Sequence, residues 1–209
     1  SVKAINQNGL KIEGLRGEFL LKIPATIDSR SIGAPDLVII MVKSFDTARA
    51  VGQHAHLFGP DTPVLTMQNG IGNIEEIEKV LPRQNIIAGT TTMSAFVKAP
   101  GVVLHTGEGK THIGPVEGDT AQAEQVAAVF NAAGLRTAVQ PDIRLAIWTK
   151  LIYNSAINAF CALTRARNGA IARVDEAKSL VRDILEEGRQ VAAAYGVDQR
   201  GRSEEHTSE

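Results

Sequence analysis

Three polar residues, Lys150, Asn154 and Asn158, follow one another at intervals of four in a segment that otherwise has the apolar pattern of a buried helix. At about 3.6 residues per turn, their side chains fall within an arc of roughly 80° on one helix face. Such a face offers one ammonium group and two carboxamides to a ligand, all able to form hydrogen bonds. The spacing therefore predicts a ligand site along this face.

The residues around this polar stripe are apolar, unlike those of a solvated helix face. Ile147, Leu151 and Ile157 border the stripe, where a solvated face would carry Glu, Lys or Gln. The opposite side carries the apolar stripe expected to face a core: Leu145, Trp148, Ile152, Ala156, Phe160 and Leu163. In the alternative interpretation, both amides bond to backbone or partner-helix groups and the lysine reaches water. Spacing alone leaves both interpretations open.

Composition narrows the class of protein. The chain has 209 residues, 44% of them hydrophobic, which allows one core and one domain plus part of another. A net charge of −1 gives no basic surface for nucleic acid or an anionic membrane, so a small-molecule partner is favoured. The single cysteine, Cys161, excludes a disulfide framework and predicts a small buried hydrophobe. No apolar run approaches a membrane span and no signal-peptide pattern occurs, which predicts a cytoplasmic protein.

The first half of the chain alternates short β-rich runs with helical segments. Strands are expected at 10–13 and 19–23, as a hairpin, and then at 37–42, 64–67 and 86–89, with crossover helices at 44–57 and 71–81. The continuous apolar run at 37–42 is typical of a central parallel strand. This order predicts an α/β domain with a largely parallel sheet.

After residue 90 the pattern changes. Strands are expected at 93–97, 102–106 and 110–113, a helix at 121–133 and a closing strand at 136–139. Gly107 and Gly109 lie between the second and third of these strands and predict an antiparallel hairpin. Beyond residue 141 we expect only helices, at 142–167 and 175–195. The predicted fold class is α/β followed by all-α, with domains at 1–140 and 141–201.

Both ends of the chain differ from a complete nucleotide-binding protein. A doubly wound sheet normally opens with a strand, a glycine-rich turn and a helix, whereas this sequence contains no GxGxxG and begins at a helix end. We therefore expect the first β-α-β unit to be missing. Residues 202–209 have no apolar periodicity and resemble the translation of a sequencing-library adapter. They are interpreted as a non-native or disordered tail.

Three loops at strand ends carry further candidate residues. Val42-Lys43-Ser44, Gln68–Gly72 and Gly89–Thr92 each follow a predicted strand, and ligands of open α/β sheets bind at the carboxyl ends of strands. A lysine can meet phosphate or carboxylate charge, and an Asn-Gly turn offers an amide and free N–H groups to a ribose or phosphate. Taken singly, each loop also fits an ordinary turn or a solvated lysine. Together they predict one crevice.

The order of these motifs resembles one family. VKSFDT, QNGIGNIEE, GTTTMSA, HTGEGKTHIG, WTKLIYNSAINAF and ARNG follow one another as in the ketopantoate reductase (2-dehydropantoate 2-reductase) family, over roughly residues 1 to 200. The Lys-x3-Asn-x3-Asn element is the most specific part. The resemblance implies a truncated Rossmann-like mixed sheet, followed by part of a helical substrate domain. It also implies NADPH-dependent reduction of 2-dehydropantoate to pantoate, in pantothenate and coenzyme A biosynthesis.

The resemblance also implies residue roles. Lys150 matches the family's proton donor to the keto oxygen. Asn154, Asn158 and Asn168 match residues that hold the substrate, and Lys43, Asn69 and Ala95 match positions that contact NADPH. The family's glycine-rich turn, the basic residue that selects the 2′-phosphate, and a serine and a glutamate of later helices have no counterparts here. The fragment itself is therefore expected to be inactive.

Two alternatives remain at this stage. The chain could belong to a related reductase of another 2-keto acid or an opine, or to a non-catalytic nucleotide-sensing protein that kept the fold. The choice between NADPH and NADH and the oligomeric state stay open, with a homodimer as one candidate. No metal site is predicted. His105 and His112, placed on the hairpin, have no carboxylate or cysteine at ligand spacing, and His54 and His56 are placed at an exposed helix end.

Overall fold

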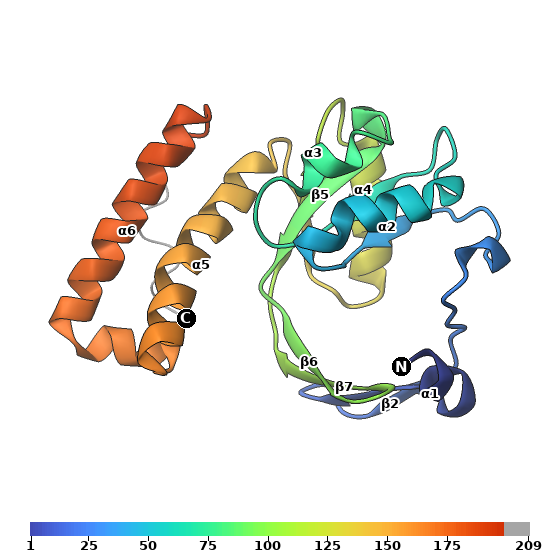
Figure 1. Ribbon diagram of the computed structural model, residues 1–209, viewed down its shortest axis with the longest axis horizontal. Helices are drawn as coiled ribbons and strands as arrows, with labels where there is room; N and C mark the ends of the chain where they lie inside the picture. Colours follow the sequence, from blue (N-terminus) through green and yellow to red (C-terminus); the bar gives the residue numbers. More distant parts are fainter. Residues whose placement is uncertain (199–209) are drawn as a thin grey trace. The chain divides into compact units, whose positions relative to one another are not determined.

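The computed structural model describes residues 1–198, except for the side chain of Asn168 (Figure 1). The tail predicted at 202–209 lies outside the described residues. The chain forms two compact units. The first consists of Ser1–Gln68 and Asn73–Pro141, and the second of Asn69–Gly72 with the described residues from Asp142 onward.

The first unit contains a five-stranded mixed sheet. Its strands, in spatial order, are β3 (Val38–Ile40), β4 (Val64–Thr66), β5 (Ile86–Thr91), β8 (Thr111–Pro115) and β9 (Thr137–Val139). β3, β4 and β5 are parallel, β8 is antiparallel to β5, and β9 is parallel to β8. This arrangement confirms the predicted Rossmann-like mixed sheet.

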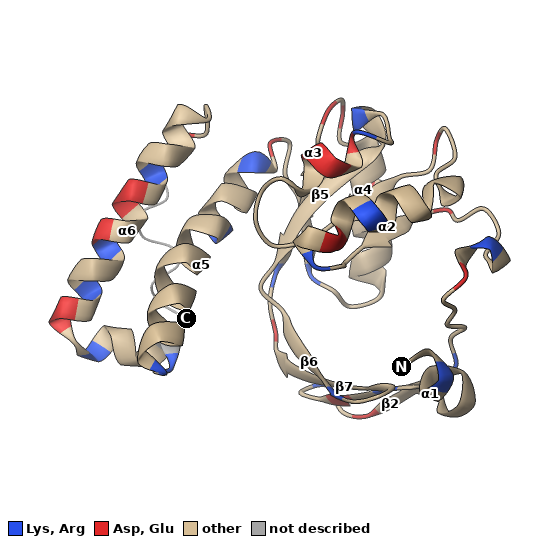
Figure 2. Ribbon diagram, viewed as in Figure 1, with Lys and Arg blue, Asp and Glu red and all other residues tan. Residues whose placement is uncertain are grey.

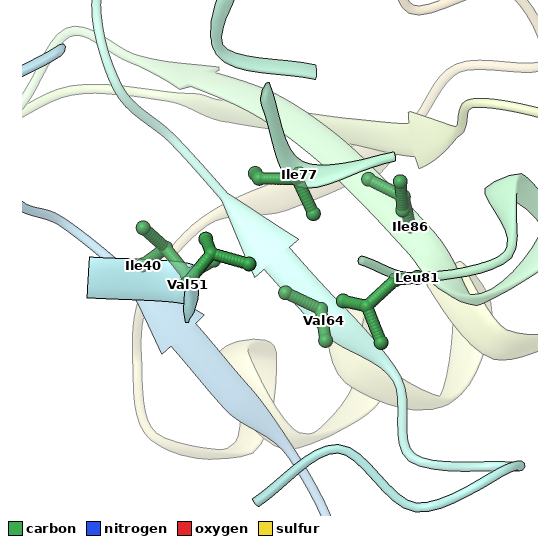
Figure 3. Close-up of a cluster of buried hydrophobic side chains, with 6 residues drawn as sticks. All are labelled: Ile40, Val51, Val64, Ile77, Leu81 and Ile86. Atoms are coloured by element: carbon green, nitrogen blue, oxygen red, sulfur yellow. The ribbon is translucent and has the colours of Figure 1, made fainter. Parts of the chain in front are cut away.

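Helices cover both faces of this sheet. They are α2 (Thr47–Gln53), α3 (Asn73–Ile77) and α4 (Ala121–Ala132), with short 3-10 turns at Ser29–Ser31, Ser44–Asp46, Ala55–Leu57 and Arg83–Asn85. Residues of α2 and α3 pack on one face, in the cluster of Figure 3: Ile40, Val51, Val64, Ile77, Leu81 and Ile86. Residues of α4 pack on the other face, against Leu65, Ile87 and Ile113. Successive strand residues such as Val64 and Leu65 thus serve opposite faces, as β-geometry requires.

A second sheet of four strands lies in the same unit. Its order is β2 (Phe19–Leu21), β1 (Leu10–Gly14), β7 (Val102–Gly107) and β6 (Ser94–Ala99), and helix α1 (Val2–Asn8) precedes it. β1 and β2 form the predicted hairpin. The predicted pairing of 102–106 with 110–113 is wrong, because β7 pairs with β1 and β6 whereas β8 pairs with β5. The hairpin is instead β6–β7, turning at Gly101, whose φ is +79°.

Two further predictions for this unit are wrong in detail. The run at 37–42 was expected to form a central strand, yet among the described residues β3 lies at the edge of its sheet, and Ile39 is 44% exposed. The helices expected at 44–57 and 71–81 are shorter than predicted, because the ends of each predicted range form 3-10 turns or loops in the structure.

The second unit is a pair of helices, as predicted. α5 (Arg144–Thr164) and α6 (Asp175–Ala194) are joined through the 3-10 segment Asn168–Arg173. Trp148 and Ile152 of α5 form a buried cluster with Ala192 and Val197. α5 ends at Arg165, which adopts left-handed geometry with φ 56°. Leu163 was expected to face the core, but it is 87% exposed beside this end.

Candidate functional site

Helix α5 places its polar stripe opposite its core-facing side. Trp148, Ile152 and Ala156 are buried, whereas Lys150 and Asn154 are half-buried and Asn158 is exposed. Trp148 also lies with its ring centroid 5.2 Å from that of Tyr195, which confirms its role as a core residue. The polar stripe therefore grades from a partly desolvated end at Lys150 to an open end at Asn158.

Hydrogen bonding separates the polar residues of α5 into two groups. The hydroxyls of Thr149, Ser155 and Thr164 each donate to a backbone carbonyl one turn earlier, at 2.7 to 2.9 Å. Within the part of the chain that the structure describes, the carboxamides of Asn154 and Asn158 make no protein hydrogen bond. Amides satisfied inside the protein would not be available to a ligand. This observation therefore favours the ligand interpretation of the two asparagines.

Lys150 is electrostatically distinct within α5. It and Arg144, in the first turn, are the two charged residues of this 21-residue helix, whereas charged residues recur along α6 (Figure 2). Burial lowers the pKa of the Lys150 ammonium from its ordinary value of 10.5. Desolvation disfavours the charged form and so makes the group a stronger acid.

The loops after β3 and β4 leave the sheet at the same edge. Ile40 pairs with Thr66 in the parallel register, and Lys43 and Asn69 each lie three residues beyond these strand ends. The Gln68 Nε2 donates to the Val42 carbonyl at 2.7 Å and joins the two loops. Lys43 and Asn69 are both exposed. The residues that immediately precede Lys43 and Asn69 in the sequence are thus bonded to each other.

The backbone between Asn69 and Asn73 is open at two glycines. Gly70 and Gly72 have φ of 90° and 91°, and nothing lies within 4 Å of a Cβ built on either residue. Asn69–Gly72 also belongs to the compact unit that contains α5, so Asn69 and Lys150 lie in the same unit. Bare backbone next to an exposed carboxamide suits the polar groups of a nucleotide.

The remaining predicted residues lie elsewhere. Ala95 is an exposed residue of β6, in the four-stranded sheet. Asn168 begins the 3-10 segment before α6, and its side chain lies outside the described residues. Cys161 is only half-buried, not a fully buried hydrophobe as expected. Sequence reasoning missed a buried hydrogen-bond network around Thr47, because nothing in VKSFDT or QNGIG shows that the Thr47 hydroxyl and the Gln68 amide are bonded to each other.

The four described histidines lie in the first unit. Among the described residues, no group of three or more His, Cys, Asp and Glu side chains could hold a metal ion. His54 is half-buried rather than exposed, and its Nδ1 lies 2.6 Å from the Ser29 Oγ. His105 is on β7 and His112 on β8, in different sheets, which corrects their placement on one hairpin. No helix in the described part is long and apolar enough to cross a membrane.

The fold and the site together define a class: a Rossmann-like α/β unit followed by a helical unit that carries a lysine and two asparagines on one face. Residues 1–118 match the family described as ketopantoate reductase PanE/ApbA, and residues 142–208 match its C-terminal part. The chain belongs to the ketopantoate reductase family.

Curated relatives and solved structures agree with this assignment. The chain is 40% identical to the 2-dehydropantoate 2-reductase of Pyrococcus horikoshii and 35% identical to that of Halobacterium salinarum, over 94% and 92% of its length. It spans 64% of the length of each relative. The 2-dehydropantoate 2-reductase structure from Geobacter metallireducens matches with a TM-score of 0.85 and 33% identity, covering 93% of this chain and 65% of that one. A D-mandelate dehydrogenase structure with NADH and anilino(oxo)acetate matches with a TM-score of 0.88 and 27% identity, covering 94% and 64%.

Proposed function

We propose that the protein carrying this chain reduces 2-dehydropantoate to pantoate with NADPH, and that Lys150 is the proton donor. One observation carries the proposal: in a chain of this family, a half-buried lysine shares a helix face with two carboxamides that have no protein partner in the described residues. This reaction belongs to the formation of pantothenate and coenzyme A.

The chemistry explains why a lysine is suited to this position. A nicotinamide bound here would supply a hydride to the carbonyl carbon, which would leave negative charge on the carbonyl oxygen. The Lys150 ammonium stabilises this developing charge more than it stabilises the neutral ketone, and so it lowers the barrier. It then transfers its proton to the oxygen, a general-acid effect typically worth about 10² to 10⁴ in rate. The lowered pKa of Lys150 favours this transfer.

The asparagines would orient the substrate. Asn154 and Asn158 offer both donors and acceptors without charge, so they bind a carboxylate or hydroxyl and do not repel an acidic substrate. Asn168 is assigned the same role through the family resemblance. A carboxylate at any of these positions would oppose the binding of a 2-keto acid.

The cofactor is assigned to the loops at the sheet edge. Asn69 supplies a carboxamide next to the open backbone at Gly70 and Gly72, and Lys43 follows β3 with a cation; groups of both kinds fit a dinucleotide. Ala95 is the third contact implied by the family. The similar D-mandelate dehydrogenase holds NADH, so a nicotinamide cofactor is well supported and the preference for NADPH is the finer part of the proposal.

A second candidate function is reduction of a different 2-keto acid, and the similarity to a mandelate dehydrogenase favours it as the alternative. Steady-state kinetics of the full-length protein would separate the two. We expect kcat/KM to be highest for 2-dehydropantoate with NADPH among a set of 2-keto acids tested with NADPH and NADH. A higher value for another keto acid would support the alternative, and binding of nucleotide without turnover would support a nucleotide-sensing protein.

The 209-residue chain itself is expected to turn over slowly or not at all. Its sequence has no GxGxxG turn to hold a pyrophosphate, and it spans 64% of the relatives' length. Robust NADPH oxidation by this chain in the presence of 2-dehydropantoate would contradict this expectation.

A further inference from the structure

Four polar side chains form a network beneath the loops that carry Lys43 and Asn69. Thr47, Thr66 and Asn73 are at most 5% exposed, and Gln68 is half-buried beside them. We call these four residues the Thr47 network. Their side chains come from α2, from β4 and its following loop, and from the start of α3. Polar groups at such depth are costly unless they are paired.

The pairing in this network is nearly complete. The Gln68 Nε2 donates to the Val42 carbonyl at 2.7 Å and to the Thr47 Oγ1 at 2.8 Å, while its Oε1 accepts from the Thr66 hydroxyl at 2.9 Å. The Thr47 hydroxyl in turn donates to the Asn73 Oδ1 at 3.1 Å. Both amide hydrogens of Gln68 and the hydroxyl hydrogen of Thr47 are therefore used.

One hydroxyl thus holds both ends of the loop Asn69–Gly72. Gln68 immediately precedes this loop and Asn73 immediately follows it, and both bond to the Thr47 Oγ1. Between them, Gly70 and Gly72 provide little conformational restraint of their own. The same Gln68 amide also fixes the carbonyl of Val42, the residue before Lys43. The spacing of the two loops consequently depends on a single buried network.

We propose that Thr47 is a positioning residue for the nicotinamide dinucleotide: its hydroxyl fixes the loop that carries Asn69 relative to the loop that carries Lys43. The proposal rests on the assignment of these two residues to the cofactor. Thr47 itself is fully buried, so its hydroxyl is not accessible to a ligand. Its effect is on the conformation of the loops, so its loss weakens cofactor binding and leaves the proton transfer step intact.

The test compares Thr47→Val, which keeps the shape and removes the hydroxyl, with Thr47→Ser, which keeps the hydroxyl. In the full-length protein, Thr47→Val should raise KM for NADPH by about tenfold, equivalent to about 1.4 kcal/mol, with kcat unchanged. Thr47→Ser should restore a KM near that of the wild type. Thr62→Val is the matched control. The Thr62 Oγ1 accepts from the Gly59 N–H before β4, outside the Thr47 network, so this variant also loses a threonine hydroxyl but should leave KM for NADPH unchanged.

Hydrogen exchange of the 209-residue chain tests the network without requiring activity. Thr47→Val should speed exchange of the amides at 69–73, whereas the core strand β5 should exchange as in the wild type. Unchanged exchange would overturn the proposal, and so would faster exchange with an unchanged KM. If Thr47→Val fails to fold, Gln68→Met removes the amide that bonds to the Thr47 Oγ1 and to the Val42 carbonyl, and it should show the same two effects. A full-length protein that reduces no keto acid would refute the proposed function, while exchange would still report on the network.

Discussion

Lys150 combines partial burial with a proposed role that requires its proton. Its pKa is lowered by burial below 10.5, so the folded protein begins to lose this proton at lower pH than a free lysine does. Turnover should therefore fall on the alkaline side through a pKa below 10.5, as measured by the pH profile of kcat in the full-length protein. Lys150→Arg, which stays protonated, should move this alkaline limb upward. An alkaline limb that is identical in the two proteins would exclude Lys150 as the titrating group.

The same shift predicts a stability effect. Because the folded state holds the Lys150 proton less tightly than the unfolded state, the unfolded state binds more protons between the two pKa values, and stability rises with pH in that window below 10.5. Lys150→Met should remove this rise. Urea denaturation at several alkaline pH values would measure it. Parallel pH dependence in both proteins would contradict the assignment of burial as the cause.

Arg165 ends α5 in a conformation that suits glycine better. In the described part of the chain, it is the one residue other than glycine with positive φ, at 56°. Arg165→Gly should raise the free energy of unfolding of the helical unit by about 1 kcal/mol, because the left-handed geometry then has no side-chain penalty. Arg167→Gly is the control: its φ is −81°, so the added chain flexibility should lower stability. Trp148 is the single tryptophan and lies in the core of the helical unit, so its fluorescence during denaturation measures the stability of both variants.

At the scale of elements, α5 and α6 approach closely at one glycine. A Cβ on Gly188 would lie 2.8 Å from the Ile152 Cγ2 and 3.0 Å from its Cγ1, within a buried part of the pair. Gly188→Leu should destabilise the helical unit by about 1–3 kcal/mol through overpacking. Gln190→Leu, at an exposed position of α6, should have little effect. Equal denaturation midpoints for the two variants would show that the helices can separate without cost.

The four-stranded sheet contains an ionic cluster that should give it an acid-sensitive stability. The Glu13 carboxylate lies 2.7 Å from the Lys11 ammonium and 2.6 Å from that of Lys98, and these bonds lower its pKa from 4.5 to about 2. A carboxylate with a lowered folded pKa contributes stability above pH 4.5 and loses it as pH falls through about 2. The difference in stability between the wild type and Glu13→Gln should shrink across this window. Chemical denaturation at pH 6, 4 and 2.5 would measure it.

Local patterns predicted the elements better than their pairing. The 3.6-residue period located α5 and α6 to within a few residues, since each has a long amphipathic stretch. The pairing of β7 with β1 could not be predicted in this way, because β1 lies about ninety residues earlier in the sequence. The residues of a short apolar strand do not indicate which other strand it will pair with. The nearby glycines Gly107 and Gly109 were therefore taken for a hairpin that the structure does not contain.

At the scale of the whole molecule, part of the candidate site could be predicted from the sequence and part could not. Spacing on one helix placed Lys150 and Asn154 on a common, partly buried face, and motif order gave the family that the comparisons establish. The Thr47 network was beyond such reasoning, because it joins side chains that are 21 and 26 residues apart through buried hydrogen bonds. A buried threonine and an ordinary surface threonine are indistinguishable in a single sequence.

The most direct test of the account is the rate of a single turnover in the full-length protein. The loss of nicotinamide absorbance measures hydride transfer from NADPH to 2-dehydropantoate. The rate constant of this transfer should be lower by a factor of about 10² to 10⁴ in Lys150→Ala. NADPH affinity should be unchanged in this variant, and Ser155→Ala should behave as the wild type because the Ser155 hydroxyl bonds only within the helix, to the Leu151 carbonyl. An unchanged rate of hydride transfer in Lys150→Ala would contradict the central claim.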